Sequence, residues 1–157
     1  MKSIFTTYIL PHITYGLSLW SPQYQKDIVL IESIQRRFTR MIVGMKDLSY
    51  EDRLAALDLP TLQERARRHD LVQTYRILNN IDNVESLFKK VKASHNKCTR
   101  NAAKENVIHN KCNFDVRKHF ITQRVTQDWN SLPQEVQQAR NLKLFKANLE
   151  ALTLKSP

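Results

Sequence analysis

The tetrapeptide His-Asn-Lys-Cys occurs twice in the chain, starting at His95 and again at His109. Two imidazoles and two thiolates, from His95, Cys98, His109 and Cys112, could together hold one tetrahedral zinc ion. Bound zinc would also explain how a short charged segment becomes ordered. Lone surface histidines and cysteines are common, however, and two matches of four residues can arise by chance. We therefore expect no cofactor, with zinc as the less favoured interpretation.

Residue spacing indicates no other reactive centre. Gly16 and Gly44 are the only glycines, too few for a glycine-rich phosphate loop. No two aspartates are adjacent, and the nearest acidic pair, Glu51 and Asp52, falls on a predicted surface helix. No Ser/His/Asp or Cys/His catalytic set is suggested by spacing. The sequence predicts no catalytic residues in this chain.

The formal net charge of the 157 residues is +10 at pH 7, and the pI is about 9.8. Residues 1–44 carry +3, residues 45–83 carry −1 and residues 84–157 carry +8. This excess favours a polyanionic partner, either nucleic acid or an anionic membrane surface. The apolar start of the chain is interrupted at Pro11 and is too short to span a bilayer. Two cysteines make no disulfide framework, so we expect a soluble intracellular protein, nuclear or cytoplasmic, without a membrane partner.

Positive side chains are concentrated in two places. Arg36 and Arg40 share one face of a predicted helix, with Arg37 beside them, and could follow a duplex backbone. The alternative is a solvated face on which Glu32 pairs with Arg36. The second group suits phosphate contacts, which need charge but little geometry. Its predicted nucleic-acid-binding residues are Lys89, Lys90, Lys92, Arg100, Lys104, Arg117, Lys118 and Arg124.

The alternative for the second group is a disordered, soluble loop, but its unbalanced charge favours nucleic-acid contact. Binding through it should be independent of base sequence and should weaken steeply with salt. A further arginine cluster, Arg65, Arg67 and Arg68, is expected to be solvated, because Glu64 and Asp70 are near.

Two tryptophans are candidates for stacking on bases. Such residues are more often core anchors, and Trp129 continues an apolar stripe that includes Phe120 and Val125. The core is therefore the preferred interpretation for Trp20 and Trp129.

Helices must position these residues, because glycine and valine are scarce while leucine, glutamine, arginine and lysine are abundant. We predict a mainly α fold, an irregular helical bundle with a short basic irregular or β-hairpin insertion. The expected segments are a helical region at 1–83, a basic arm or hairpin at 84–118, and C-terminal helices at 119–157 that pack on the first region.

Individual helices follow from periodicity and end signals. A helix over 2–19 should kink or break at Pro11, and one over 23–43 should end at Gly44. The apolar stripe of the latter is Ile28, Ile31, Ile34 or Gln35, Phe38, Met41 and Met45. Capping boxes should begin helices at Ser49 (with Asp52), at Thr61 (with Glu64) and near Pro133 (Ser131 with Gln134). Asn141 should cap a last helix with the face Leu142, Phe145, Leu149 and Leu152.

Five strings occur together in one order: YILPHITYGLSLWSP (8–22), ESIQRRFTRMIVG (32–44), DLSYEDRLAALDLP (47–60), YRILNN (75–80) and DVRKHFITQRVTQDWNSLP (115–133). At this spacing they resemble the region after the polymerase palm of LINE-type (non-LTR) retrotransposon reverse transcriptases. The resemblance covers nearly the whole chain.

The resemblance implies an RNA-directed DNA polymerase for target-primed insertion, in which this portion is the thumb and its C-terminal extension. Its partners would be RNA and DNA, as an RNA–DNA or DNA duplex, and the polymerase palm that this sequence lacks. The catalytic carboxylates of the family lie upstream in an aromatic-x-Asp-Asp motif and bind Mg²⁺. Because that motif is missing, we expect a non-catalytic fragment, truncated copy or domesticated remnant that is inactive alone.

A protein–protein interaction module is the alternative function. The stripe over residues 28–45 has nearly heptad spacing and could bind a partner helix. An apolar patch left uncovered by an absent palm would have the same effect.

Overall fold

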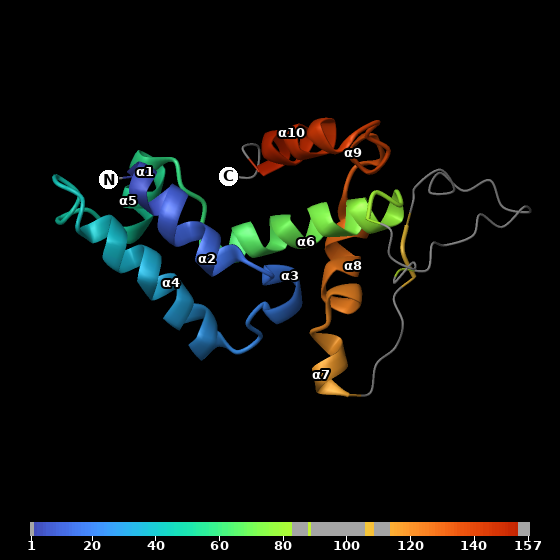
Figure 1. Cartoon of the computed structure of the whole chain (residues 1–157), viewed down its shortest axis with the longest axis horizontal. Helices are drawn as coiled ribbons and strands as arrows, with labels where there is room; N and C mark the ends of the chain where they lie inside the picture. The colour runs from blue at the N-terminus through green and yellow to red at the C-terminus, as the bar shows by residue number, and fades with distance from the viewer. Residues whose placement is uncertain (1, 83–87, 89–105, 109–113, 154–157) are drawn as a thin grey trace, which may run out of the picture. The chain divides into compact units, whose positions relative to one another are not determined.

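The computed structural model describes residues 2–82, 88, 106–108 and 114–153, and this part of the chain is built from helices (Figure 1). The first half contains α1 (Lys2–Ile4), a π-helical segment (Phe5–Ile9), α2 (Leu10–Thr14), α3 (Leu17–Trp20), α4 (Gln25–Arg40), α5 (Tyr50–Leu57) and α6 (Leu62–Leu78). The second half contains α7 (Asp115–Lys118), α8 (Ile121–Ser131), α9 (Gln134–Gln137) and α10 (Leu142–Thr153). The predicted mainly α class is confirmed.

The chain divides into two compact units, Met1–His69 and Asp70–Pro157. The division falls inside α6, so the two halves of one helix belong to different units. The three segments expected from the sequence, 1–83, 84–118 and 119–157, divide the chain differently and stay predictions. Most of the predicted basic arm lies outside the described residues, although its last four residues form α7.

The first unit has a small apolar core made by the N-terminal segment, α4, α5 and the start of α6: Phe5, Leu10, Phe38, Leu54, Leu59 and Leu62. The rings of Phe5 and Phe38 stack with centroids 4.6 Å apart, which fastens the N-terminal segment to α4. The Gln35 side chain, also buried, donates from Nε2 to the carbonyl oxygen of Pro60 at 2.9 Å. This bond satisfies an amide that would otherwise be costly to bury.

The N-terminal helical segment breaks later than predicted. Before Pro11 the chain widens into a π-helical turn, in which the Leu10 N–H donates to the Phe5 carbonyl five residues back. Pro11 then sits in the first turn of α2, where its missing N–H costs least. The break comes at Tyr15 and Gly16, because Tyr15 is extended and Gly16 adopts a left-handed φ of 61° that glycine tolerates best.

The predicted end of α4 at Gly44 is wrong by one turn. The Met41 N–H donates to the Phe38 carbonyl, a tighter turn that ends the helix at Arg40. Gly44 lies in the loop beyond it with a φ of 80°. The predicted stripe is correct at Phe38 and wrong at Met41, which is 60% exposed.

The caps of α5 and α6 are confirmed. The Ser49 Oγ accepts from the Asp52 N–H at 3.1 Å and begins α5. Thr61 and Glu64 satisfy each other's backbone N–H groups at 3.1 and 2.9 Å, which is a full capping box for α6. Asn80, just beyond the end of α6, has a left-handed φ of 52°.

The core of the second unit is formed by the last turns of α6 with α8, α9 and α10, and its centre is aromatic. Trp129 and Phe145 are fully buried, and Tyr75 stacks on Phe145 with ring centroids 4.3 Å apart. The Tyr75 hydroxyl donates to the Ala139 carbonyl at 2.5 Å, so this buried polar group is satisfied.

The C-terminal helices differ from prediction at two residues. Phe120 is 45% exposed, because it occupies the extended cap between α7 and α8 rather than a continuous helical stripe. Ser131 forms no capping box, since its hydroxyl donates to Asp128 O, and Pro133 takes the cap position of α9. Asn141 caps α10 as predicted, accepting from the Leu144 N–H at 2.8 Å.

Candidate nucleic-acid interface

Helix α4 turns its buried face to the first core and its opposite face to solvent. Gln35, Phe38 and Thr39 are buried on the inner face. Arg36, Arg37 and Arg40 are exposed. The three predicted contact arginines are therefore brought together on an accessible surface, which we call the α4 basic face.

The carboxylate expected to neutralise Arg36 is held elsewhere. Glu32 accepts a short hydrogen bond from the Tyr50 hydroxyl through Oε1, and Oε2 accepts from the Leu62 N–H at 3.0 Å. The Arg36 guanidinium instead lies over the Tyr50 ring, 4.7 Å from its centroid. Glu32 thus joins α4, α5 and the beginning of α6. The alternative in which Glu32 pairs with Arg36 is not observed, because both carboxylate oxygens bind other residues.

Tyr50 is held in its neutral form by this arrangement. Burial raises the pKa of the Tyr50 phenol well above its ordinary value, and the hydrogen bond to Glu32 raises the pKa further. Arg36 acts in the opposite direction, but more weakly. The result is a fixed donor that keeps Glu32 away from the basic face.

Arg37 and Arg40 are the open cations of this surface. Within the part of the chain that the structure describes, neither has a hydrogen bond or a carboxylate partner. Lys26, at the other end of α4, lies over the Tyr24 ring at 5.6 Å and is also exposed. Exposed, unneutralised cations on one rigid helix can contact phosphates without first breaking an ion pair.

Three arginines of α6 were expected to be solvated. Arg67 is exposed, as predicted, whereas Arg65 and Arg68 are half-buried. Glu64 is engaged in the capping box, and Asp70 pairs with another arginine. Burial lowers the pKa of both guanidiniums, and the charge of Arg68 lowers that of Arg65 further. The sequence shows Glu64 and Asp70 close to these arginines, but it does not show that each carboxylate binds another residue.

Arg65 also carries a buried Nε that has no hydrogen-bond partner among the described residues. A buried guanidinium N–H without an acceptor is costly, so this side chain is a further place where an anion would be stabilised.

Arg124 is placed differently from the other predicted contacts. Its Nε and Nη2 bond both carboxylate oxygens of Asp70 at 2.7 and 2.8 Å, and Nη1 donates to the His119 carbonyl at 2.8 Å. All three guanidinium nitrogens of Arg124 therefore donate hydrogen bonds within the protein. Arg124 therefore has a structural role in the second unit, and nucleic-acid contact by this residue stays a prediction.

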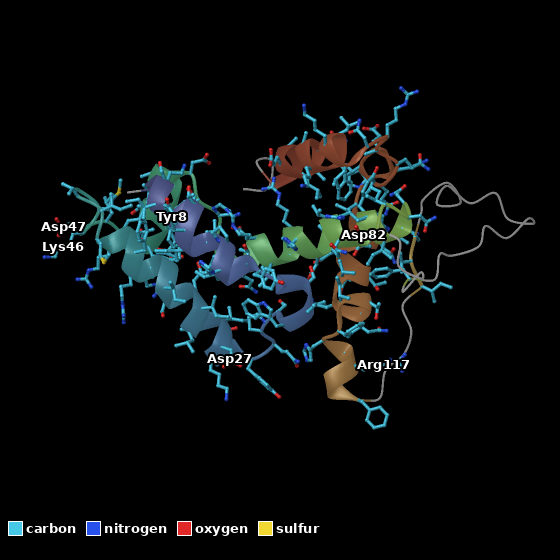
Figure 2. All side chains as sticks on the ribbon, in the orientation of Figure 1. Tyr8, Asp27, Lys46, Asp47, Asp82 and Arg117 are labelled. Atoms are coloured by element: carbon cyan, nitrogen blue, oxygen red, sulfur yellow. The ribbon has the colours of Figure 1, made fainter. Side chains whose placement is uncertain are left out.

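Arg117 and Lys118 lie exposed on α7, and Figure 2 labels Arg117 on that helix. The other predicted contacts, Lys89, Lys90, Lys92, Arg100 and Lys104, fall outside the described residues. So do the four zinc candidates, His95, Cys98, His109 and Cys112. Among residues 2–82, 88, 106–108 and 114–153, no group of three or more His, Cys, Asp or Glu side chains is arranged to hold a metal ion.

The two tryptophans differ in burial. Trp129 is fully buried, which confirms the core interpretation, and its carbonyl accepts from the Gln137 amide at 2.8 Å. Trp20 is 44% exposed, so the core interpretation is wrong for this residue. It lies on α3, a four-residue helix whose buried anchor is Leu17 instead.

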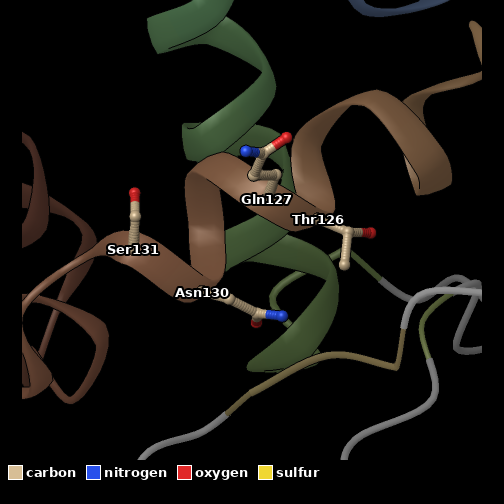
Figure 3. A pocket seen from close by; sticks show the side chains of 4 residues that line it. All are labelled: Thr126, Gln127, Asn130 and Ser131. Carbon is tan, nitrogen blue, oxygen red and sulfur yellow. The ribbon is translucent and has the colours of Figure 1, made fainter.

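A surface pocket on α8 is lined by Thr126, Gln127, Asn130 and Ser131 (Figure 3). Three of these side chains already hydrogen bond within the protein. Asn130 bonds both backbone groups of Val107, at 2.9 and 3.0 Å, while Thr126 and Ser131 donate to carbonyls of α8. The pocket offers one uncommitted amide, on Gln127, and no ionisable group.

No described helix is both long enough and apolar enough to cross a membrane. Comparisons of the chain with protein-family models, with curated proteins and with solved structures found no match.

Proposed function

We propose that this chain binds duplex nucleic acid through phosphate contacts, as the resemblance to the post-palm region of LINE-type reverse transcriptases suggests. The observation that carries the proposal is the α4 basic face, where Arg37 and Arg40 are exposed and have no carboxylate partner among the described residues. Glu32, the carboxylate one turn before Arg36, is bound to Tyr50 and Leu62. A net charge of +10 supports the same kind of partner.

The arrangement suits backbone contact rather than base recognition. Arg36 and Arg40 are one helical turn apart, about 6 Å along the axis. Phosphates carry full negative charge along the whole duplex, so a row of exposed guanidiniums binds them in many registers. Binding should therefore depend strongly on salt and weakly on base sequence.

The experiment measures binding of the chain to a labelled 20-base-pair RNA–DNA or DNA duplex, by fluorescence anisotropy over a series of salt concentrations. Arg37→Gln combined with Arg40→Gln should weaken binding and make the slope of log K against log salt shallower by about 2, one for each phosphate contact removed. Lys143→Gln combined with Lys146→Gln is the matched control, since it removes two exposed cations from α10.

Equal losses in the two double variants would mean that binding reflects net charge alone and would overturn the assignment to α4. Absence of any shift for the unmodified chain, even at low salt, would reject nucleic-acid binding itself. A heparin column gives the same comparison without a choice of duplex.

In the same proposal the chain is non-catalytic. Two-metal phosphoryl transfer requires carboxylates clamped around Mg²⁺, and no two aspartates of this sequence are adjacent. The chain alone should bind a template–primer without extending it. A primer-extension assay with Mg²⁺ and nucleotides tests this statement, and extension by the purified chain would contradict it.

Docking of a protein partner is the second candidate. Exposed apolar side chains favour it: Leu30 and Ile34 on α4, and Met41 at the C-terminal cap of that helix. The first core uses only part of the stripe expected to bind a partner, since it includes Phe38 and takes Ile31 against it. Substituting Leu30 and Ile34 by Gln should leave duplex binding unchanged if those residues serve a protein partner.

A further inference from the structure

Three large aromatic side chains are exposed within ten residues of the first unit. Tyr15 is 84% exposed, Trp20 is 44% exposed and Tyr24 is 65% exposed. Trp20 is the last residue of α3, and Tyr15 and Tyr24 lie on either side of this short helix, which follows α2 and precedes α4 along the chain (Figure 1). A folded surface seldom leaves so much aromatic area uncovered without a use for it.

Contacts within the first unit fix the turn that carries Tyr15 and Trp20. The Trp20 Nε1–H donates to the Tyr15 carbonyl at 2.6 Å, which fixes the orientation of the indole. The indole Cδ1 lies 3.6 Å from the position of a Cβ on Gly16, so the ring edge rests against the left-handed turn. Leu17 is buried below α3 and Ser18 bonds the His69 ring at 3.2 Å. Tyr15 and Trp20 therefore stand on an anchored turn, and Tyr24 is the N-cap residue of α4.

The charge around the rings favours an anion. Residues 1–26 contain no aspartate or glutamate, and the first carboxylate of the chain is Asp27 in the first turn of α4. Lys26 lies over the Tyr24 ring at 5.6 Å and supplies a cation at the edge of the aromatic surface. The indole N–H is already bonded to the Tyr15 carbonyl, so Trp20 offers its apolar faces rather than a donor.

We propose that Tyr15, Trp20 and Tyr24 form a stacking surface for the unpaired bases of a nucleic-acid strand. Every base has a π-face, and aromatic side chains beside positive charge bind single strands with little sequence preference. The proposal rests on the proposed function and adds a substrate class to it: a duplex that continues into an unpaired strand. We call the three residues the stacking surface.

The length of α4 sets how far that strand must extend. Tyr24 precedes Arg36 by twelve residues, which corresponds to about 18 Å along a helix. A strand that keeps the duplex spacing of about 3.4 Å per nucleotide needs about five unpaired nucleotides to reach Tyr24 from Arg36. Shorter overhangs should therefore gain less affinity than longer ones.

The test compares four probes with the whole chain: a blunt 20-base-pair duplex, the same duplex with a three-nucleotide thymidine overhang, with a ten-nucleotide one, and with ten abasic residues. The abasic overhang keeps the phosphates and removes the bases. We expect the ten-nucleotide thymidine overhang to bind about tenfold more tightly than the abasic one, since stacking contributes measurably per base.

Tyr15→Leu combined with Tyr24→Leu should abolish that preference and leave blunt-duplex affinity unchanged. Both side chains are mostly exposed, so the variant should fold normally, and unchanged blunt-duplex binding confirms that it has. Tyr8→Leu is the matched control: Tyr8, labelled in Figure 2, is 68% exposed and lies in the preceding π-helical segment. It should behave like the unmodified chain.

Three results would overturn the stacking surface. Equal affinity for abasic and thymidine overhangs would show that only phosphates are bound. If the Tyr15/Tyr24 double variant still preferred the thymidine overhang to the abasic one, the bases would bind at another site. The exposed rings would then be candidates for contact with a protein partner. In both cases blunt-duplex binding, and with it the proposed function, would stand. Absence of binding to every probe at low salt would reject both proposals together.

Discussion

Arg124 and Asp70 meet in a two-point ion pair, with guanidinium Nε 2.7 Å from Oδ2 and Nη2 2.8 Å from Oδ1. The Asp70 side chain is 7% exposed and that of Arg124 is 20% exposed, so the pair is largely removed from solvent. The pair joins the second half of α6 to α8, and its two residues are 54 positions apart in the chain. A parallel pair of charge-assisted bonds fixes orientation as well as distance.

Breaking this pair should destabilise the second unit. Asp70→Asn leaves a guanidinium without its countercharge, and we expect the free energy of unfolding to fall by about 3 kcal/mol. Arg124→Lys keeps the charge but cannot bond both oxygens in the same plane, so its loss should be smaller yet clear. Urea unfolding monitored by circular dichroism measures both.

Asp70→Asn combined with Arg124→Gln is the control, and it should be less damaging than the sum of the single changes, because no lone charge remains buried. Strict additivity would show that the two side chains do not depend on each other. Arg124→Gln should also affect duplex binding less than Arg37→Gln, if Asp70 keeps Arg124 from phosphates.

The Tyr50–Glu32 bond gives a pH-dependent stability. The folded chain holds the Tyr50 proton more tightly than the unfolded chain, because burial and then Glu32 raise the pKa of the phenol. The stabilisation is therefore complete below about pH 10, the ordinary tyrosine value, and declines as the pH rises further. Tyr50→Phe should cost about 1.5 kcal/mol at pH 8, since it removes a hydrogen bond to a charged group.

The measurement is the free energy of unfolding of both proteins between pH 8 and pH 11. The advantage of the unmodified chain over Tyr50→Phe should shrink above about pH 10. Tyr24→Phe is the control, because Tyr24 is 65% exposed and its hydroxyl has no hydrogen bond to the described residues. A Tyr50→Phe difference that stays constant over this range would contradict the assignment.

Asn130 should hold the segment around Val107 against α8. Its amide accepts from the Val107 N–H at 2.9 Å and donates to the Val107 carbonyl at 3.0 Å, which reproduces the pairing of a neighbouring strand. Val107 is itself buried in the second core. Asn130→Asp replaces the donor by an oxygen that faces a carbonyl, and we expect a loss of about 2 kcal/mol.

Amide hydrogen exchange locates that effect. The Val107 N–H should be protected in the unmodified chain and exchange faster in Asn130→Asp, while amides in α4 stay unchanged. Gln127→Glu serves as the control on the same helix, since Gln127 is exposed and lines the pocket of Figure 3. Faster exchange in both variants would point to the added charge rather than to the lost donor.

Local signals in the sequence predicted three helix N-termini correctly. Thr61 with Glu64, Ser49 with Asp52 and Asn141 with Leu144 all bond across three residues, so the partners are fixed by the chain itself. Where such a signal failed, a competing local partner explains it, as when the Ser131 hydroxyl donated to Asp128 O. Helical periodicity likewise placed Trp129 and Phe145 in a core without knowledge of its other members.

The candidate site depended on contacts between distant residues. Glu32 is one turn from Arg36 in sequence, yet its oxygens bind Tyr50 and Leu62, 18 and 30 residues away. Asp70 is two residues from Arg68 but pairs with Arg124. A carboxylate binds the donor with the better geometry and the deeper burial, and only folding brings that donor near.

The sequence by itself therefore determined a basic, mainly helical chain with its caps and much of its second core, because periodicity and capping act over three or four residues. The tertiary structure decided which of the charges remain available. It left Arg37 and Arg40 open, engaged Arg124, and left Trp20 exposed beside Tyr15 while Leu17 was buried in its place. A charged side chain is available to a ligand only if no other residue of the protein already binds it. In this chain the residues that bind these side chains come from helices far apart in the sequence.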